Sequence, residues 1–159
     1  MLCVDVDNPR INQCVMEHIR NVALKDKMKT IICDIDGTIF KYQGGTPEVT
    51  NNRVEPLPGV IKQMNQWEME GSRIIIITGR RESLREKTEK DLQRFGIPYD
   101  VLLMGYADSG RVLINDEGSI TKAHAVSLER DKGFKEYDWR KVGLTLYPRP
   151  NKNEILNGF

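Results

Sequence analysis

The most informative stretch of the sequence is Ile31-Ile32-Cys33-Asp34-Ile35-Asp36-Gly37-Thr38. It begins as an apolar run rich in β-branched residues, which is typical of a buried strand, and residues 30–35 are too few for a helix. Two carboxylates two positions apart end the run, and Gly37 allows a sharp turn after them. Because neighbouring carboxylates repel each other, Asp34 and Asp36 indicate a bound cation, a bound proton or a chemical task.

Apolar runs and amphipathic segments alternate along the rest of the chain. Strands are expected at residues 30–35, 73–78, 101–104 and 112–115, and helices at residues 11–28, 58–71, 82–95 and 121–130. The inward face of the helix at 82–95 is expected to hold Leu84, Thr88, Leu92 and Phe95. Residues 38–58 are expected as a loop with a small hairpin at 42–46. Buried strands that alternate with helices predict a three-layer, doubly wound parallel α/β fold of Rossmannoid type.

Composition excludes several classes of protein. With 24 Lys and Arg against 23 Asp and Glu, the 159-residue chain has a formal net charge of +1. Such a balance supplies no bulk field for a polyanion, so a dedicated nucleic-acid coat protein is not expected. Cys3, Cys14 and Cys33 match no metal-ligand spacing, and reduced thiols are expected. No apolar run is long enough to span a bilayer and no export signal begins the chain, so we expect a cytoplasmic protein without membrane contact.

Polar residues follow several of the expected strands at their carboxyl ends, which is where ligands bind in open parallel sheets. Thr78-Gly79-Arg80 combines a hydroxyl, a permissive backbone and a guanidinium, an arrangement that binds anions. Asp116 follows the expected strand at 112–115 and adds a carboxylate at the same edge. A hard divalent ion such as Mg²⁺ suits this acid group, because it takes oxygen ligands. Metal and phosphate together are the simplest joint interpretation.

These motifs resemble the signatures of the haloacid dehalogenase (HAD) superfamily in its phosphatase form. Residues 31–38 look like the first signature, residues 77–80 like the second and residues 114–116 like the acidic fourth, so the resemblance covers about residues 29–117. It implies a HAD-type phosphomonoesterase that transfers the phosphoryl group in two steps through an aspartyl-phosphate.

The resemblance also implies a role for each residue. Asp34 would be the covalent nucleophile, and Asp36 would act as the general acid and base. Mg²⁺ would be held by Asp34, by the main-chain carbonyl of Asp36 and by Asp116, although Asn115 and Glu117 beside Asp116 leave the last ligand open. Phosphate binding is expected from Thr78, Gly79, Arg80 and Arg111.

Arg111 replaces a lysine in this scheme. The third HAD signature is normally a lysine shortly before the fourth strand, and the sequence has none between Leu92 and Asn115. Arg111 is the best substitute by position. The remaining candidates are Lys87, Lys90 and Lys122.

The segments at 38–58 and 80–111 are too short for a cap domain, so we expect a capless enzyme whose open site is covered by its substrate or by a second copy in a homo-oligomer. Near-neutral charge favours a sugar phosphate or similar small metabolite. A polynucleotide 3′-phosphatase and a non-catalytic phosphate-binding or signalling module are the alternatives. The expected division is a helical extension (1–28), a HAD-like catalytic core (29–130) and a C-terminal tail (131–159) that packs on the core or on a partner subunit.

Overall fold

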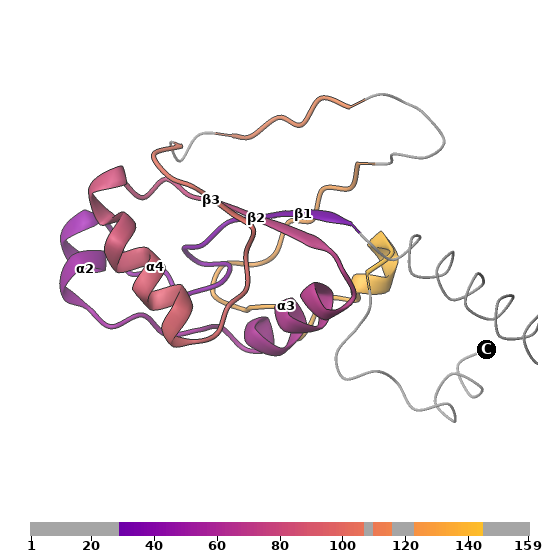
Figure 1. The fold of residues 1–159 in the computed structure, drawn as a ribbon, viewed down its shortest axis with the longest axis horizontal. Helices are drawn as coiled ribbons and strands as arrows, with labels where there is room; N and C mark the ends of the chain where they lie inside the picture. The colour runs from indigo at the N-terminus through magenta and orange to yellow at the C-terminus, as the bar shows by residue number, and fades with distance from the viewer. Residues whose placement is uncertain (1–28, 107–109, 116–122, 145–159) are drawn as a thin grey trace, which may run out of the picture.

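A three-stranded parallel sheet organises the chain (Figure 1). The computed structural model describes residues 29–106, 110–115 and 123–144. The strands are β1 (Thr30–Cys33), β2 (Arg73–Ile77) and β3 (Val101–Leu103), in that order in the sheet. The helices are α2 (Thr46–Asn51), α3 (Val60–Met69) and α4 (Arg85–Arg94), with short 3₁₀ turns η1 (Glu82–Leu84) and η2 (Trp139–Val142). The expected parallel α/β class is therefore confirmed. No described helix has the length and apolarity needed to cross a membrane.

Helices α3 and α4 lie on the same side of the sheet (Figure 1). Ile76 of β2 stands opposite Leu102 of β3, and both side chains are buried. On the other face, Ile32 of β1 is 52% exposed and Val101 of β3 is 42% exposed. This difference follows from the two-residue period of a strand, which sends alternate side chains to opposite faces. The described residues thus form two layers, and they do not supply the third layer expected from the sequence.

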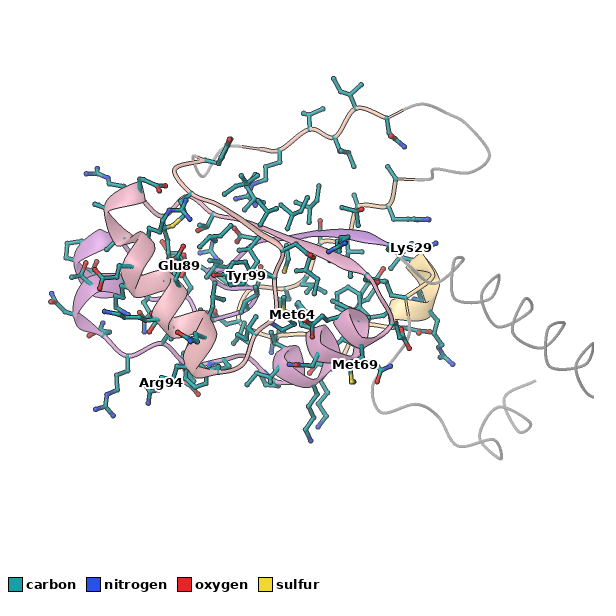
Figure 2. The ribbon with its side chains drawn as sticks, in the orientation of Figure 1. Lys29, Met64, Met69, Glu89, Arg94 and Tyr99 are labelled. Carbon is teal, nitrogen blue, oxygen red and sulfur yellow. The ribbon has the colours of Figure 1, made fainter. Side chains whose placement is uncertain are left out.

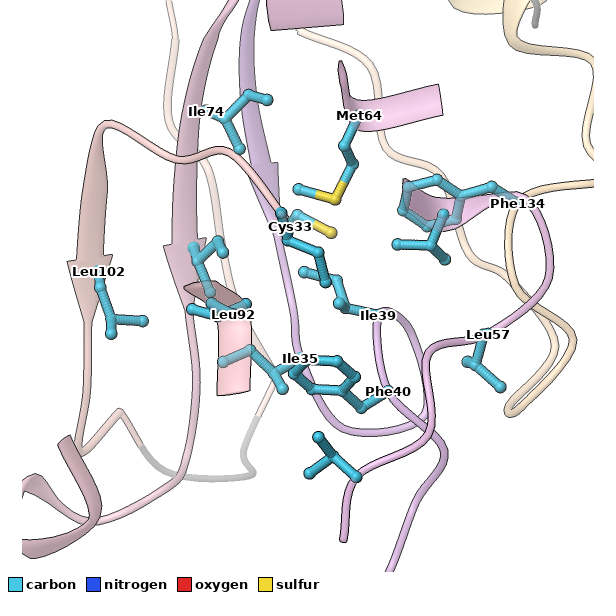
Figure 3. Close-up of a cluster of buried hydrophobic side chains, with 14 of the residues drawn as sticks. Cys33, Ile35, Ile39, Phe40, Leu57, Met64, Ile74, Leu92, Leu102 and Phe134 are labelled. Atoms are coloured by element: carbon cyan, nitrogen blue, oxygen red, sulfur yellow. The ribbon is translucent and has the colours of Figure 1, made fainter. Parts of the chain in front are cut away.

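The hydrophobic core lies between the sheet, the helices and the loop after β1 (Figure 3). Ile35, Ile39 and Phe40 follow β1 directly and are fully buried. Burial of side chains of this size contributes roughly 1.5–3 kcal/mol each, so the loop that carries the acid pair is anchored by its own apolar residues.

Aromatic side chains attach the segment near the C-terminus to α3. Trp67 of α3 packs edge-on against Trp139 with ring centroids 4.8 Å apart and lies 5.6 Å from the ring of Phe134. The indole N–H of Trp139 donates to the carbonyl of Phe134 over 3.0 Å, so the buried polar group is satisfied. Residues 134–144 therefore belong to the same core as the sheet, while the domain boundary at residue 130 stays a prediction.

The expected strand at 112–115 is wrong for the described structure. Val112, Leu113 and Ile114 are 86%, 64% and 90% exposed, and the segment runs outside the sheet (Figure 1). Apolar β-branched residues indicate strand propensity, but a strand forms only when an edge pairs with it, and that pairing is a tertiary contact. Asn115 therefore follows an exposed segment here, and Asp116 lies outside the described residues.

Two further local expectations are wrong. Residues 123–130 are not helical: Val126 and Leu128 pack against the core two positions apart, which is the spacing of an extended chain. The hairpin expected at 42–46 is absent, and α2 begins at Thr46 with a proline in its first turn, where proline suits a helix. The expected helix at 11–28 lies outside the described residues.

Gly133 lies close to the main chain of Pro58. Its φ is 74°, and a Cβ added there would lie 2.5 Å from the main-chain oxygen of Pro58. The same oxygen accepts a hydrogen bond from the N–H of Phe134 over 2.9 Å. A side chain at Gly133 would therefore push apart the contact that inserts Phe134 into the core.

Replacement of Gly133 by alanine is expected to destabilise the protein by about 3 kcal/mol, of which about 1–2 kcal/mol is the left-handed backbone and the rest the clash. Gly96→Ala is the matched control, because Gly96 has φ 61° and nothing within 4 Å of the added Cβ. Urea unfolding of both variants measures the difference. Equal losses would mean that the close approach to Pro58 does not limit the side chain.

Candidate active site

The loop after β1 turns tightly around one carbonyl. The main-chain oxygen of Ile35 accepts hydrogen bonds from the N–H groups of Thr38, Ile39 and Phe40 at 2.8–3.2 Å. Gly37, with φ 85°, donates its N–H to the oxygen of Phe40 over 2.7 Å. This conformation favours glycine because it has no Cβ. The turn leaves buried Ile35 between the two acidic residues and places both carboxylates at the carboxyl edge of the sheet.

Asp34 is paired with Arg111. The guanidinium Nη2 of Arg111 donates to Oδ1 of Asp34 over 3.1 Å, and the Asp34 side chain is 31% exposed. Burial raises the pKa of Asp34 above its usual value, while the hydrogen bond and charge of Arg111 oppose the rise. The exposed segment after β3 thus brings to Asp34 the cation that the sequence placed in the third signature. Its phosphate-binding role stays a prediction.

Asp36 is held by a buried guanidinium. Arg80 donates from Nε to Oδ2 of Asp36 over 2.9 Å and from Nη2 to Oδ1 over 2.7 Å. Its third contact runs from Nη1 to Oγ1 of Thr88 on α4 over 3.2 Å. The Arg80 side chain is 3% exposed and that of Asp36 is 20% exposed. A two-bond fork of this kind sets both the position and the rotation of a carboxylate.

This geometry adds a second role to the one predicted for Arg80. Three of its five N–H donors are engaged with Asp36 and Thr88, which suits a positioning role for the guanidinium, and phosphate binding by Arg80 stays a prediction. Thr88 was expected on the inward face of its helix but not as a site residue. The signal that could have found it is a hydroxyl in an otherwise apolar stripe, where a buried polar group needs a partner.

Thr78 and Gly79 lie where the ends of β2 and β3 are joined. The Thr78 N–H donates to the oxygen of Leu103 over 2.9 Å, and the Thr78 oxygen accepts from the N–H of Tyr106 over 3.1 Å. Thr78 Oγ1 accepts from the N–H of Arg80 over 3.2 Å, and the Thr78 side chain is buried. The contact orients the backbone around Gly79, and phosphate binding by Thr78 and Gly79 stays a prediction.

The other candidate cations are less well placed. Lys87 pairs with Asp91 and Lys90 with Glu86 along α4, each at 2.6 Å, so both lysines are engaged on the helix itself. Lys122 lies outside the described residues.

Cys33, next to Asp34, is not a candidate nucleophile. Burial raises the pKa of its thiol to about 12, and thiolate is the reactive form.

The turn after β1 carries two oxygen donors of the kind that Mg²⁺ takes. The Asp34 carboxylate is partly exposed, and among the described residues no hydrogen bond reaches the main-chain oxygen of Asp36. A hard cation takes such oxygens and keeps several waters, so the donor chemistry fits. The described residues contain no group of three acidic, histidine or cysteine side chains able to hold a metal, and Asp116 lies outside them. The magnesium site therefore stays a proposal.

The chain combines a parallel α/β sheet with an acid pair after its first strand and a Thr-Gly-Arg turn after its second. Residues 28–112, just over half of the chain, match the family model described as the phosphatase domain of polynucleotide kinase PNKP, and the chain belongs to this family. It is a HAD-type phosphatase. A comparison with curated proteins finds no match.

Solved structures also show similarity to this chain. Two chains from structures of a Pnkp1/Rnl/Hen1 complex, the second described as an RNA repair complex, are 31% and 30% identical, each with a TM-score of 0.44 over 54% of this chain. The alignments cover 30% and 28% of those chains. A target protein from Vibrio cholerae is 26% identical over 55% of this chain and 80% of its own, with a TM-score of 0.39. The protein thus spans less than a third of the first two relatives.

Proposed function

We propose that this protein is a Mg²⁺-dependent phosphatase that removes the terminal 3′-phosphate from a polynucleotide. The observation that carries the proposal is the match of residues 28–112 to the PNKP phosphatase domain, because that region contains the acid pair and both arginines of the site. The expectation of a sugar phosphate depends on the net charge of +1. A net charge averages over the whole chain and does not describe the field at one edge, so the family match supports the polynucleotide alternative better.

The first step is phosphoryl transfer to Asp34. A carboxylate oxygen of Asp34 attacks phosphorus, the new O–P bond forms, and the bond from phosphorus to the 3′-oxygen breaks. Arg111, which donates to Oδ1 over 3.1 Å, keeps the carboxylate oriented and leaves the second oxygen for attack. Because burial disfavours the charged form of Asp34, loss of that charge on attack is favoured by the site.

Asp36 acts in both steps. In the first step it gives a proton, as general acid, to the departing 3′-oxygen, and in the second step its carboxylate takes a proton from the water that attacks the phosphoryl group and releases phosphate. The bond between phosphorus and Asp34 breaks, inorganic phosphate leaves, and both aspartates return to their starting state. Mg²⁺, bound by Asp34 and the main-chain oxygen of Asp36, would neutralise charge between nucleophile and phosphate.

A direct comparison of substrates tests this function. We expect kcat/KM for a 3′-phosphorylated oligonucleotide to exceed that for a hexose phosphate by more than about 10²-fold with Mg²⁺ present, because several nucleotides can contact the open site. Released phosphate is the measurement, and the same oligonucleotide with a 5′-phosphate is the control for end specificity. Faster turnover of the hexose phosphate would overturn the proposal and restore the small-metabolite hypothesis.

A further inference from the structure

Arg130 and Asp131 contact the turn that carries the acid pair. The N–H of Asp131 donates to the oxygen of Gly37 over 2.9 Å, and Oδ1 of Asp131 accepts from the N–H of Tyr42 over 2.7 Å. Asp131 has φ 66°, which is uncommon for a residue with a side chain. Asp131 therefore forms hydrogen bonds both to the turn after β1 and to the start of the following loop, although about 90 residues separate it from them in the sequence.

Arg130 lies directly against that turn. Its Cγ is 2.9 Å from the position that a Cβ on Gly37 would occupy. The Arg130 side chain therefore packs directly against Gly37, the residue after Asp36. The guanidinium carbon stands 4.5 Å from the centre of the Tyr42 ring. Both side chains are exposed, Tyr42 at 45%. An aromatic face and a cation are thus held together beside the acid pair.

The charge of Arg130 is available for a ligand. Of the neighbouring carboxylates, Asp131 accepts from Tyr42, and Glu129 lies 3.9 Å from the ammonium of Lys132. Within the described part of the chain Arg130 forms no ion pair. Lys41, another exposed cation of the loop after β1, lies beside Glu55 instead.

We propose that Tyr42 and Arg130 form a binding platform for the single-stranded end of a polynucleotide whose terminal phosphate reaches Asp34. Bases of single strands stack on aromatic rings and guanidinium planes, and phosphodiesters bind cations, so one pair of residues serves both parts of a nucleotide. A hexose phosphate has neither an aromatic base nor a second phosphate for this pair. The inference rests on the proposed function and adds the contact that distinguishes a polynucleotide from a small phosphate.

The test compares Tyr42→Ala and Arg130→Gln on two substrates, a short 3′-phosphorylated oligonucleotide and p-nitrophenyl phosphate. For each variant we expect KM for the oligonucleotide to rise about tenfold, as loss of one stacking or phosphate contact predicts, and to rise more than KM for the aryl phosphate. Arg130→Gln should also flatten the salt dependence of oligonucleotide binding.

Arg94→Gln is the matched control, since Arg94 also lies over an aromatic ring, that of Phe95 at 5.3 Å, but at the far end of α4 (Figure 2). It should match the wild type on both substrates. Equal losses on the two substrates would mean that the pair only supports the catalytic loop, and no loss would remove the platform; either result overturns the inference.

Fluorescence anisotropy with a labelled 3′-hydroxyl oligonucleotide separates the two proposals. Hydrolysis of the oligonucleotide by the wild type with unchanged binding by Tyr42→Ala and Arg130→Gln would leave the proposed function standing and reject the platform. Failure of the wild type to hydrolyse the oligonucleotide would reject the proposed function, and failure to bind it would reject the platform as well.

Discussion

Replacement of Asp34 by asparagine is expected to lower kcat more than about 10³-fold, the scale seen when a covalent nucleophile is removed. The amide has nearly the same shape as the carboxylate, but its oxygen cannot form the phosphoryl ester that the proposed first step requires. Release of phosphate from p-nitrophenyl phosphate with Mg²⁺ measures the effect, and a rate equal to that of the wild type would contradict the nucleophile assignment.

The same variant should not lose stability, although it loses activity. Burial raises the pKa of Asp34, so at neutral pH the folded protein holds a carboxylate whose charged form is disfavoured relative to the unfolded chain. A group with a raised pKa lowers stability as pH rises above its unfolded value, and a neutral amide removes that penalty. Asp34→Asn is therefore expected to unfold at the same temperature as the wild type or higher at pH 7. A clear decrease would show that the Arg111 contact outweighs the burial.

Asp100→Asn is the matched control for this substitution. Asp100 lies at the opposite edge of the sheet, where it accepts from the N–H of Ile74 over 2.7 Å and from Arg73 over 2.6 Å. These bonds hold the pKa of Asp100 below its usual value, so loss of the charge is expected to lower stability and to leave activity intact. Asp34→Asn should thus lose activity without losing stability, whereas Asp100→Asn should lose stability without losing activity.

Replacement of Arg80 by lysine is expected to lower kcat about 10²-fold with little change in KM, because a displaced catalytic group costs rate and not binding. Lysine keeps the charge but lacks the planar fork that reaches both oxygens of Asp36 and the hydroxyl of Thr88. Steady-state kinetics give the two parameters. A large rise in KM with normal kcat would instead support the phosphate-binding role predicted from the sequence.

Variants of Thr88 extend that test. Thr88→Val removes the hydroxyl at nearly constant volume and leaves a buried N–H of Arg80 without its partner, which costs roughly 1–3 kcal/mol of stability. We expect kcat to fall in the same direction as in Arg80→Lys, by less. Thr88→Ser keeps the hydroxyl and should restore kcat. If Thr88→Ser loses activity and Thr88→Val keeps it, the methyl group and not the hydrogen bond is what matters at Thr88.

Much of the fold could be predicted from the sequence because its signals are local. The apolar runs at 30–33, 73–77 and 101–103 are strands, and the helices at 60–69 and 85–94 lie within the predicted ranges. The acid pair was predicted for the same reason, since a turn-forming glycine and two carboxylates directly follow a buried strand. Local propensity and hydrophobic period are enough to specify such features.

The missed features depend on contacts between distant residues. The apolar run at 112–114 has the propensity of a strand but no paired edge in the described structure, and 123–130 takes its extended form from packing on the core. The fork from Arg80 to Asp36 and the packing of Arg130 against Gly37 join residues far apart in the chain. The sequence by itself therefore indicated which residues are candidates for chemistry. The partners of those residues depended on how distant segments pack. A hydrogen bond or ion pair forms only when folding brings two groups within a short distance, and the sequence does not record that distance.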